Sequence, residues 1–190
     1  MKKSGMKDFE DKLRNLKDYI ALATVPASSY SKSNKEMIRI LINTQNTPGV
    51  YVTLNKPFNI LEKDFKISKI DINKIIFIDA VTKTAGGKTS KTKNCLFIGS
   101  PENLSDISLA MDQAVRAVPG KEKFVFFDSL STLLIFNSAE VVARFIHFLA
   151  GKMRVWKVKG IIISLEDKKN NKELIDKLSQ VCDIVLDLGG

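Results

Sequence analysis

The sequence has little cysteine or histidine and no long apolar run. Its 190 residues include Cys 2 and His 1, and no CxxC motif or histidine cluster accompanies the cysteines, which argues against a zinc site or a disulfide framework. Cys95 and Cys182 both lie inside apolar runs, as is typical of small core residues. No apolar run approaches the ~18 residues that a membrane span needs, and residues 1–5 lead into a charged segment instead of the apolar core of a signal peptide. We therefore expect a cytoplasmic protein without a metal site or membrane contact.

Positively charged residues, by contrast, outnumber negatively charged ones. Lys+Arg 30 against Asp+Glu 21 gives a formal net charge of +9. Hydrophobic residues make up 44% and charged residues 27%, values close to those of globular proteins, which excludes a disordered or fibrous chain. The length suits a core that buries roughly 70% of the surface of the unfolded chain. The composition therefore predicts an ordinary globular protein whose positive charge favours acidic partners such as nucleic acid.

The spacing of apolar residues near the N-terminus differs from that in the rest of the chain. Phe9, Leu13, Leu16 and Ile20 recur at helical spacing, which predicts an amphipathic helix over residues 6–23. Pro26 and a polar stretch then interrupt the pattern. The expected organisation is an N-terminal helix and linker over residues 1–34, followed by one domain over residues 35–190.

The remainder alternates between short apolar runs and amphipathic segments. Continuous hydrophobicity is typical of strands that are covered on both faces, as in parallel sheets. Three amphipathic segments, residues 104–118, 138–153 and 172–182, have the spacing of crossover helices. The pattern predicts an α/β protein with three layers, α/β/α, and a mainly parallel central sheet, whose ligands bind beyond the carboxyl ends of the strands. The expected strands are residues 37–42, 50–54, 75–79, 95–98, 124–128, 160–164 and 183–188.

One strand has the form of a Walker B element. Residues 124–128 place four bulky apolar residues before Asp128, and a carboxylate held rigidly at a strand tip can bind the Mg²⁺ of a nucleoside triphosphate. Residues 75–79 repeat the pattern and end in Asp79, so the pattern is not specific. Asp128 is therefore either a weak candidate for binding Mg²⁺ or a residue that caps a turn.

The longer sequence around Asp128 adds a resemblance. Asp128-Ser-Leu-Ser-Thr-Leu-Leu-Ile-Phe-Asn137, with residues 142–149 and 158–164, resembles the KaiC-like branch of the RecA superfamily. It is most similar there to archaeal single-domain proteins described as inactivated KaiC/RecA-type ATPases with suspected roles in signal transduction. The similarity covers roughly residues 37–188. It implies a RecA-like fold of the P-loop NTPase class and an ancestral site for ATP and Mg²⁺.

The sequence departs from that family at the nucleotide site. A working member follows its first core strand with GxxxxGK[ST], whose amides and lysine hold the phosphates at a helix N-terminus. The expected first strand, residues 37–42, instead leads through Thr44 directly towards the next strand, with no lysine and no room for a helix. Where the family has a catalytic glutamate pair, this sequence has Asn55 and Lys56. We therefore predict a degenerate site of Thr44, Asn55, Lys56, Asp128 and Ser129, without catalytic residues or a cofactor.

A second segment imitates a phosphate loop. Residues 82–89 end in Gly-Gly-Lys-Thr but have Thr82 in place of the first glycine. The next residues read as a polar loop and a strand, so the helix that a phosphate site requires is missing. The segment is interpreted as a basic loop, with a phosphate site or a contact to an anionic partner as alternatives.

The excess charge falls into two clusters on opposite edges of the expected sheet. We expect a non-catalytic module that acts through protein contacts or self-association. The alternative is a nucleic-acid-binding module that uses the basic loops, although two clusters on opposite edges do not form one groove. The first cluster is Lys83, Lys88, Lys91 and Lys93, and the second is Lys152, Arg154, Lys157 and Lys159.

Overall fold

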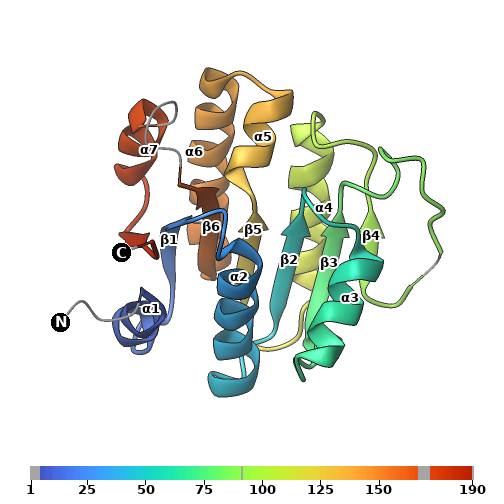
Figure 1. Cartoon of the computed structure of the whole chain (residues 1–190), viewed down its shortest axis with the longest axis horizontal. Coiled ribbons are helices and arrows are strands. Elements are labelled where there is room, and N and C mark those ends of the chain that lie inside the picture. Colours follow the sequence, from blue (N-terminus) through green and yellow to red (C-terminus); the bar gives the residue numbers. More distant parts are fainter. Residues whose placement is uncertain (1–4, 91, 167–171, 190) are drawn as a thin grey trace.

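A computed structural model of the chain describes residues 5–90, 92–166 and 172–189. Seven strands form one parallel sheet in the order β4-β3-β2-β5-β6-β1-β7 (Figure 1). The strands are β1 (Tyr19–Val25), β2 (Gly49–Thr53), β3 (Ile75–Asp79), β4 (Cys95–Phe97), β5 (Phe124–Asp128), β6 (Lys159–Leu165) and β7 (Ile184–Asp187). The helices are α1 (Gly5–Leu13), α2 (Tyr30–Arg39), α3 (Phe58–Ile67), α4 (Leu104–Ala117), α5 (Leu130–Phe136), α6 (Ala139–Trp156) and α7 (Lys172–Ser179), with the short turns η1 (Ile40–Thr44) and η2 (Ile72–Lys74).

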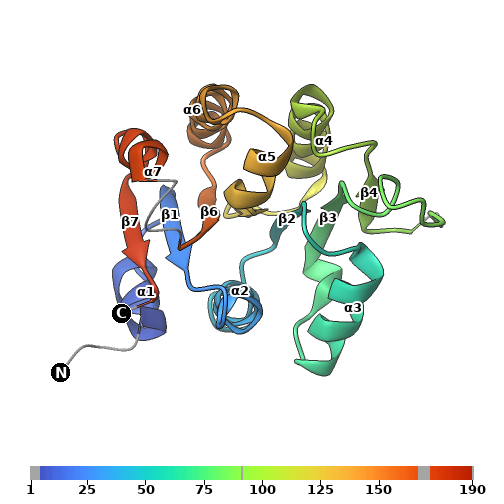
Figure 2. The ribbon, with the colours of Figure 1, turned by 45° about the horizontal axis from the view of Figure 1, so that its top comes forward.

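The helices form a layer on each face of the sheet. Figure 2 shows α4, α5, α6 and α7 on one face and α1, α2 and α3 on the other. Each layer closes its own apolar cluster against the sheet, and every residue of β2 and β5 is buried. Burial on both faces explains why these strands are continuously apolar in sequence. The predicted three-layer α/β/α architecture with a parallel sheet is confirmed.

The first strand lies where a helix was expected. α1 ends at Leu13, and β1 (Tyr19–Val25) pairs with β6 on one side and β7 on the other. Phe9 and Leu13 are buried as the amphipathic pattern predicts, whereas Leu16 is exposed. The apolar residues of β1 happened to continue the helical spacing of α1. The α/β fold therefore begins ahead of residue 35, and the expected boundary at residue 34 falls inside α2.

The expected strand over residues 37–42 is also wrong, because these residues are helical. They form the end of α2 and most of η1. Asn34, Met37, Ile38 and Leu41 are buried, which is the i, i+3, i+4, i+7 pattern of one helix face. A short and mostly apolar run does not distinguish a buried strand from a buried helix segment by periodicity alone.

The remaining predicted elements agree with the structure to within a few residues. The predicted bounds of β3 and β5 coincide with the observed ones, whereas α3 and α5 had no counterpart in the sequence analysis. Within the described residues, no helix combines the length and the hydropathy that a membrane crossing requires. The two errors at the N-terminal end matter most, because they change which loop follows the first strand.

Candidate functional site

Two neighbouring strands end at the same edge of the sheet and bring the predicted site residues together. β2 and β5 pair in register, with Thr53 opposite Asp128. Asn55 and Lys56 follow β2, and Ser129 follows β5 directly. Because the carboxyl ends of parallel strands meet at one edge, four of the five residues of the predicted nucleotide site lie in one region.

Asp128 lies at the centre of a hydrogen-bonded cluster of side chains. Only 2% of its surface is exposed. The Tyr51 hydroxyl donates to Oδ2 at 2.5 Å, and the Tyr30 hydroxyl donates to Oδ1. Asn55 Nδ2 also donates to Oδ1, at 3.2 Å. Both carboxyl oxygens therefore have partners from within the protein.

The cluster continues through the Asn55 amide to the start of α5. Asn55 Nδ2 lies 3.1 Å from Ser129 Oγ and 2.5 Å from the Tyr30 hydroxyl. Thr132 donates to Asn55 Oδ1 and shares a 3.0 Å hydrogen bond with Ser129. We call this set the Asp128 network. Its members are Tyr30, Tyr51, Asn55, Asp128, Ser129 and Thr132.

Burial decides the charge of the central acid. Removal from water disfavours the ionised carboxylate and raises the pKa of Asp128 to about 8. Burial also raises the pKa of Tyr51, so that its hydroxyl keeps its proton. When Asp128 is neutral, its own proton can be donated to one of the hydroxyls, so the contacts persist in either state.

The loop after the first strand differs from the one expected. β1 is followed by Pro26-Ala-Ser-Ser-Tyr-Ser-Lys-Ser33, and α2 begins inside this segment at Tyr30. The spacing matches GxxxxGK[ST], with Lys32 and Ser33 at its last two positions and Pro26 and Ser31 in place of the glycines. The expected absence of both the helix and the lysine was therefore wrong. The signal that could have found this loop was the pair Lys32-Ser33, seven and eight residues after the apolar run that ends at Val25.

The space between this loop and Asp128 is largely filled by side chains. Tyr30 reaches from the first turn of α2 to Asp128, and its hydroxyl donates a hydrogen bond to the carboxyl group. The cavity that remains beside Asp128 has a volume of about 10 Å³, roughly the space of one water molecule. Lys32 is exposed. Without glycine at positions 26 and 31, the backbone also lacks the residues that allow close approach to phosphate. Protein side chains therefore fill the region beside Asp128 in this structure.

Two residues of the predicted site have other positions or roles. Thr44 is exposed at the end of η1 and precedes β2, so it lies at the amino edge of the sheet, away from Asp128. Its inclusion in the site was wrong, because the strand that would have led to it is helical. Lys56 is half-buried, and its ammonium group donates to Ser31 Oγ at 3.1 Å, which ties the loop after β2 to the start of α2.

The Gly-Gly-Lys-Thr segment follows β3, and no helix follows it. Residues 87–90 and 92–94 are irregular, and β4 begins at Cys95. Asp79, which ends β3, accepts hydrogen bonds from the backbone amides of Val81 and Thr82 at 2.7 and 2.8 Å. A pocket of about 320 Å³ lies between this loop and α3, lined by Lys88 and Glu62 among others. The segment therefore lacks the helix that a phosphate loop would open.

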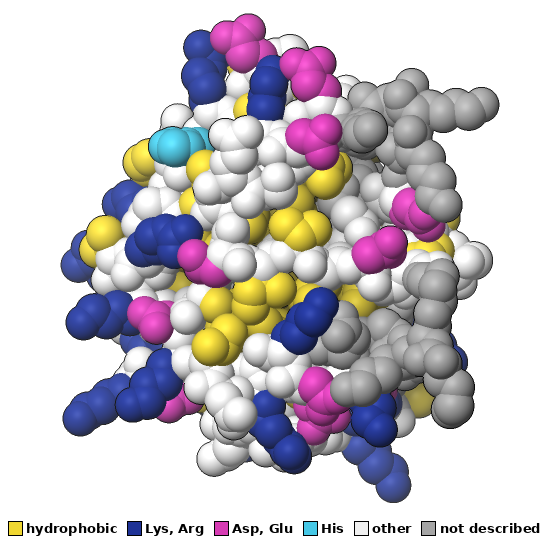
Figure 3. All heavy atoms as spheres, turned by 90° about the vertical axis from the view of Figure 1, so that its left-hand side faces the viewer, with side chains coloured by type: hydrophobic (Ala, Val, Ile, Leu, Met, Phe, Trp, Pro, Cys, Tyr) yellow, Lys and Arg dark blue, Asp and Glu magenta, His cyan; other side chains and the backbone are white. Residues whose placement is uncertain are grey.

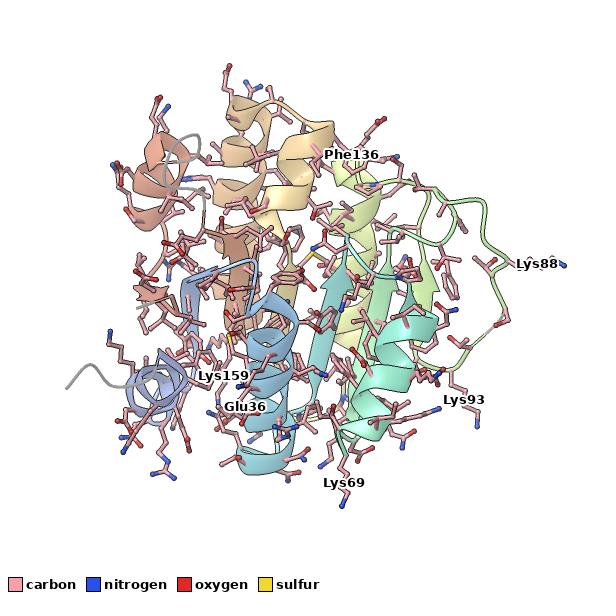
Figure 4. The ribbon with its side chains drawn as sticks, in the orientation of Figure 1. Glu36, Lys69, Lys88, Lys93, Phe136 and Lys159 are labelled. Atoms are coloured by element: carbon pink, nitrogen blue, oxygen red, sulfur yellow. The ribbon has the colours of Figure 1, made fainter. Side chains whose placement is uncertain are left out.

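The first basic cluster is exposed at the carboxyl edge. Lys83, Lys88 and Lys93 are exposed, and none has an acidic partner within the described part of the chain. Lys91 lies outside the described residues. Figure 4 shows Lys88 pointing away from the body of the molecule at the tip of the loop. These cations are free to contact a partner.

The second cluster lies at the amino edge and is largely neutralised. Lys159 is buried at the start of β6, with its ammonium group 2.9 Å from Gln45 Oε1 (Figure 4). Figure 3 shows basic and acidic side chains interspersed over the face at the β7 edge. Three of the four cations of the second cluster are therefore paired with acids, whereas Lys157 is exposed and has no ion pair among the described residues. The acidic partners are Asp112 for Lys152, Asp183 for Arg154 and Glu122 for Lys159.

Comparisons with known proteins identify related sequences and folds. Residues 70–188 match the family model described as a family of unknown function (DUF7504). No curated protein matches the chain in sequence. Among solved structures, the chain is similar to the KaiC-like protein PH0186 from the hyperthermophilic archaeon Pyrococcus horikoshii OT3, with a TM-score of 0.64 and 16% identity over 97% of this chain and 79% of that one.

A second solved structure has the same arrangement. It is the uncharacterized protein PH0321 from Pyrococcus horikoshii in complex with an unknown peptide, with a TM-score of 0.69 and 14% identity over 95% of this chain and 82% of that one. At these identities the likeness concerns the fold. The three-layer architecture is therefore that of RecA-like and KaiC-like proteins.

Proposed function

The chain belongs to the DUF7504 family of unknown function, and from this premise we propose that its KaiC-like domain is a non-catalytic regulatory module that acts through contacts with a protein partner. The observation that carries the proposal is the closed Asp128 network. Tyr30 and Tyr51 take up both oxygens of the acid that a working ATPase would direct at Mg²⁺. Signal transduction in an archaeal cytoplasm is the setting that we propose for such a module.

The site also lacks a group that could activate water. ATP hydrolysis in this fold needs a carboxylate that polarises the attacking water, and the loop after β2 offers an amide at Asn55 and a cation at Lys56. Both side chains are engaged, Asn55 within the Asp128 network and Lys56 with Ser31. An ATPase reaction would therefore require changes in the loops after both β1 and β2.

A protein partner is supported by precedent and by charge. PH0321, which has a similar fold, forms a complex with an unknown peptide. The net charge of +9 favours an acidic partner. A second candidate function is nucleic-acid binding, and the exposed cations Lys83, Lys88 and Lys93 favour it. The neutralised second cluster weakens it, because only one free basic patch remains.

The proposal is tested by thermal unfolding with and without millimolar Mg-ATP. A ligand at 100 times its dissociation constant stabilises the folded state by about 2.7 kcal/mol, which is easily detected as a rise in Tm. We expect no rise. A RecA-type ATPase with an intact phosphate loop serves as the positive control. A clear rise in Tm that needs both ATP and Mg²⁺ would contradict the proposal.

A further inference from the structure

An open apolar groove lies between α4 and α6. Both helices belong to the layer opposite α2 and α3 (Figure 2). The groove has a volume of about 600 Å³, which is within the range of ligand-binding clefts. Its apolar lining is contributed by Leu104 and Leu109 of α4 and by Val141, Phe145 and Phe148 of α6.

Only part of the apolar lining belongs to the core. Val141, Phe145 and Phe148 stand at i, i+4 and i+7, so they form one stripe along α6. Phe145 is 7% exposed and also packs in the core with Ile146 and Leu149, with its ring centre 6.1 Å from that of Phe127. Phe148 is 49% exposed and Leu109 is 59% exposed. Large apolar side chains that gather at a groove and remain this exposed mark an interaction surface.

The charged residues of the groove are predominantly basic. Arg144 and Lys152 line it together with one acid, Asp112. Asp112 is already engaged, because Arg116 donates to it at 2.8 Å and Trp156 Nε1 at 3.3 Å. The hydrogen bond from Arg116 lowers the pKa of Asp112 and so favours its ionised form.

The cations beside the groove outnumber its acids, because Asp112 is shared by Arg116 and by Lys152, whose ammonium group lies 3.7 Å from Asp112 Oδ1. Arg144 has only a loose ion pair with Glu140, 3.4 Å long, in which both side chains are strongly exposed. Such exposed pairs contribute little, so Arg144 can exchange its partner at small cost. The ammonium group of Lys152 lies 5.8 Å from the ring centre of Phe148, at the edge of the apolar stripe. A ligand that buries its apolar side on Phe148 therefore meets positive charge beside it.

We propose that the groove between α4 and α6 binds an acidic amphipathic helix of a partner protein. The lining of α6 runs from Val141 to Lys152, a length of about 16 Å at the helical rise of 1.5 Å per residue, which matches three turns of a bound helix. Two helices with a groove between them receive a third through anchors at i, i+4 and i+7. A second copy of this chain would place cations against cations, because each copy carries a net charge of +9.

This inference rests on the proposed function, because it names the class of partner that the module would bind. It concerns another surface, since the groove lies between two helices of one layer and the Asp128 network lies at the carboxyl edge of the sheet. A negative peptide experiment and a positive Mg-ATP experiment are therefore independent outcomes.

The test uses a display library of random peptides of about 16 residues, selected against the full chain. We expect enriched peptides to carry apolar residues at i, i+4 and i+7 with glutamate or aspartate between them. The affinity of one enriched peptide is then measured by fluorescence anisotropy. Leu109→Ser and Phe148→Ser should each weaken binding at least about tenfold. Ile60→Ser on α3 is the matched control, because Ile60 is also 49% exposed but lies on the opposite layer, and it should leave binding unchanged.

A charge exchange tests the acidic character of the partner. The double change Arg144→Glu and Lys152→Glu should abolish binding of the acidic peptide, and the same peptide with lysine in place of its acids should bind this variant. Failure to enrich any peptide, enrichment of basic peptides, or binding that survives Phe148→Ser would overturn the proposal. A dimer of the chain that dissociates on Phe148→Ser would also overturn it, because the groove would then be an interface between copies.

Discussion

Asp79 and Asp128 end two strands that read almost alike. Each follows four apolar residues, each is buried, and each stands opposite Thr53 of β2 in the sheet, one on either side. The two acids differ in what donates to them. Asp79 accepts from the backbone amides of Phe58, Val81 and Thr82, whereas Asp128 accepts only from side chains.

The type of donor indicates how strongly the local fold depends on each acid. Backbone amides cannot turn to other partners, so Asp79 is needed to hold the start of α3 and the turn after β3. The donors to Asp128 are hydroxyl and amide side chains that can find other acceptors. Asp79 and Asp128 therefore have different roles although the sequences before them are similar, and the groups that donate hydrogen bonds to them show the difference. Three experiments test this comparison.

The largest difference should appear on removal of each carboxyl group. Asp79→Ala leaves three amides and the Thr82 hydroxyl without their acceptor and should lower the free energy of unfolding by about 4 kcal/mol. Asp128→Ala should cost about half as much, because the Tyr30 and Tyr51 hydroxyls can reorient. Urea unfolding at pH 6 measures both. Equal losses would show that the two acids are held in the same way.

The second experiment uses the raised pKa of Asp128, about 8 in the folded state against roughly 3.9 in an unfolded chain. Between these values the folded state retains a proton that the unfolded state has lost, so stability is fully present below pH 4 and falls as the pH rises to 8. The slope is at most about 1.4 kcal/mol per pH unit. Asp128→Asn keeps the shape without the titration, so wild type should lose about 3 kcal/mol more than the variant between pH 5.5 and 8.5. Parallel stability curves for the two proteins would contradict the raised pKa.

The smallest effect concerns the loop that follows Asp79. Replacement of Lys83, Lys88 and Lys93 by Gln should change stability by less than about 0.5 kcal/mol, because these side chains are exposed. Lys159→Gln is the contrasting control, since its ammonium group is buried beside Gln45 and Glu122. The same triple variant tests the nucleic-acid alternative in a mobility-shift assay. Tight binding of duplex DNA by wild type, with a salt slope that the triple variant reduces, would favour that alternative over a protein partner.

Much of the fold could be predicted because most strands are buried on both faces. The bounds of β3 and β5 followed from continuous apolar runs that end in an acid. β1 and α2 could not be assigned correctly, because a short apolar run fits either a strand or a buried helix face. That single ambiguity moved the expected loop from residues 26–33 to residues 43–49 and added Thr44 to the site.

Some residues of the Asp128 network could be predicted from the sequence and others could not. Asn55, Asp128 and Ser129 follow strands, and position in the chain was enough to place them together. Tyr30 and Tyr51 were missed. In the sequence, Tyr51 looks like one more large residue of a buried strand. The acceptor of its hydroxyl, Asp128, lies 77 positions further along the chain. A contact of that separation exists only in the folded protein. A tyrosine within an otherwise aliphatic strand is the signal that would justify a search for a buried acid.

The contact of Tyr30 with Asp128 has a consequence for how this domain could be controlled. When a nucleotide bridges a loop and the end of a strand, the occupancy of its site depends on the nucleotide concentration in the cell. Tyr30 belongs to the same chain as Asp128, so its effective concentration at the acid is set by connectivity and does not vary with the supply of ATP. Under the function that we propose, the domain does not respond to the supply of ATP, and the abundance of a protein partner is the variable to which it responds.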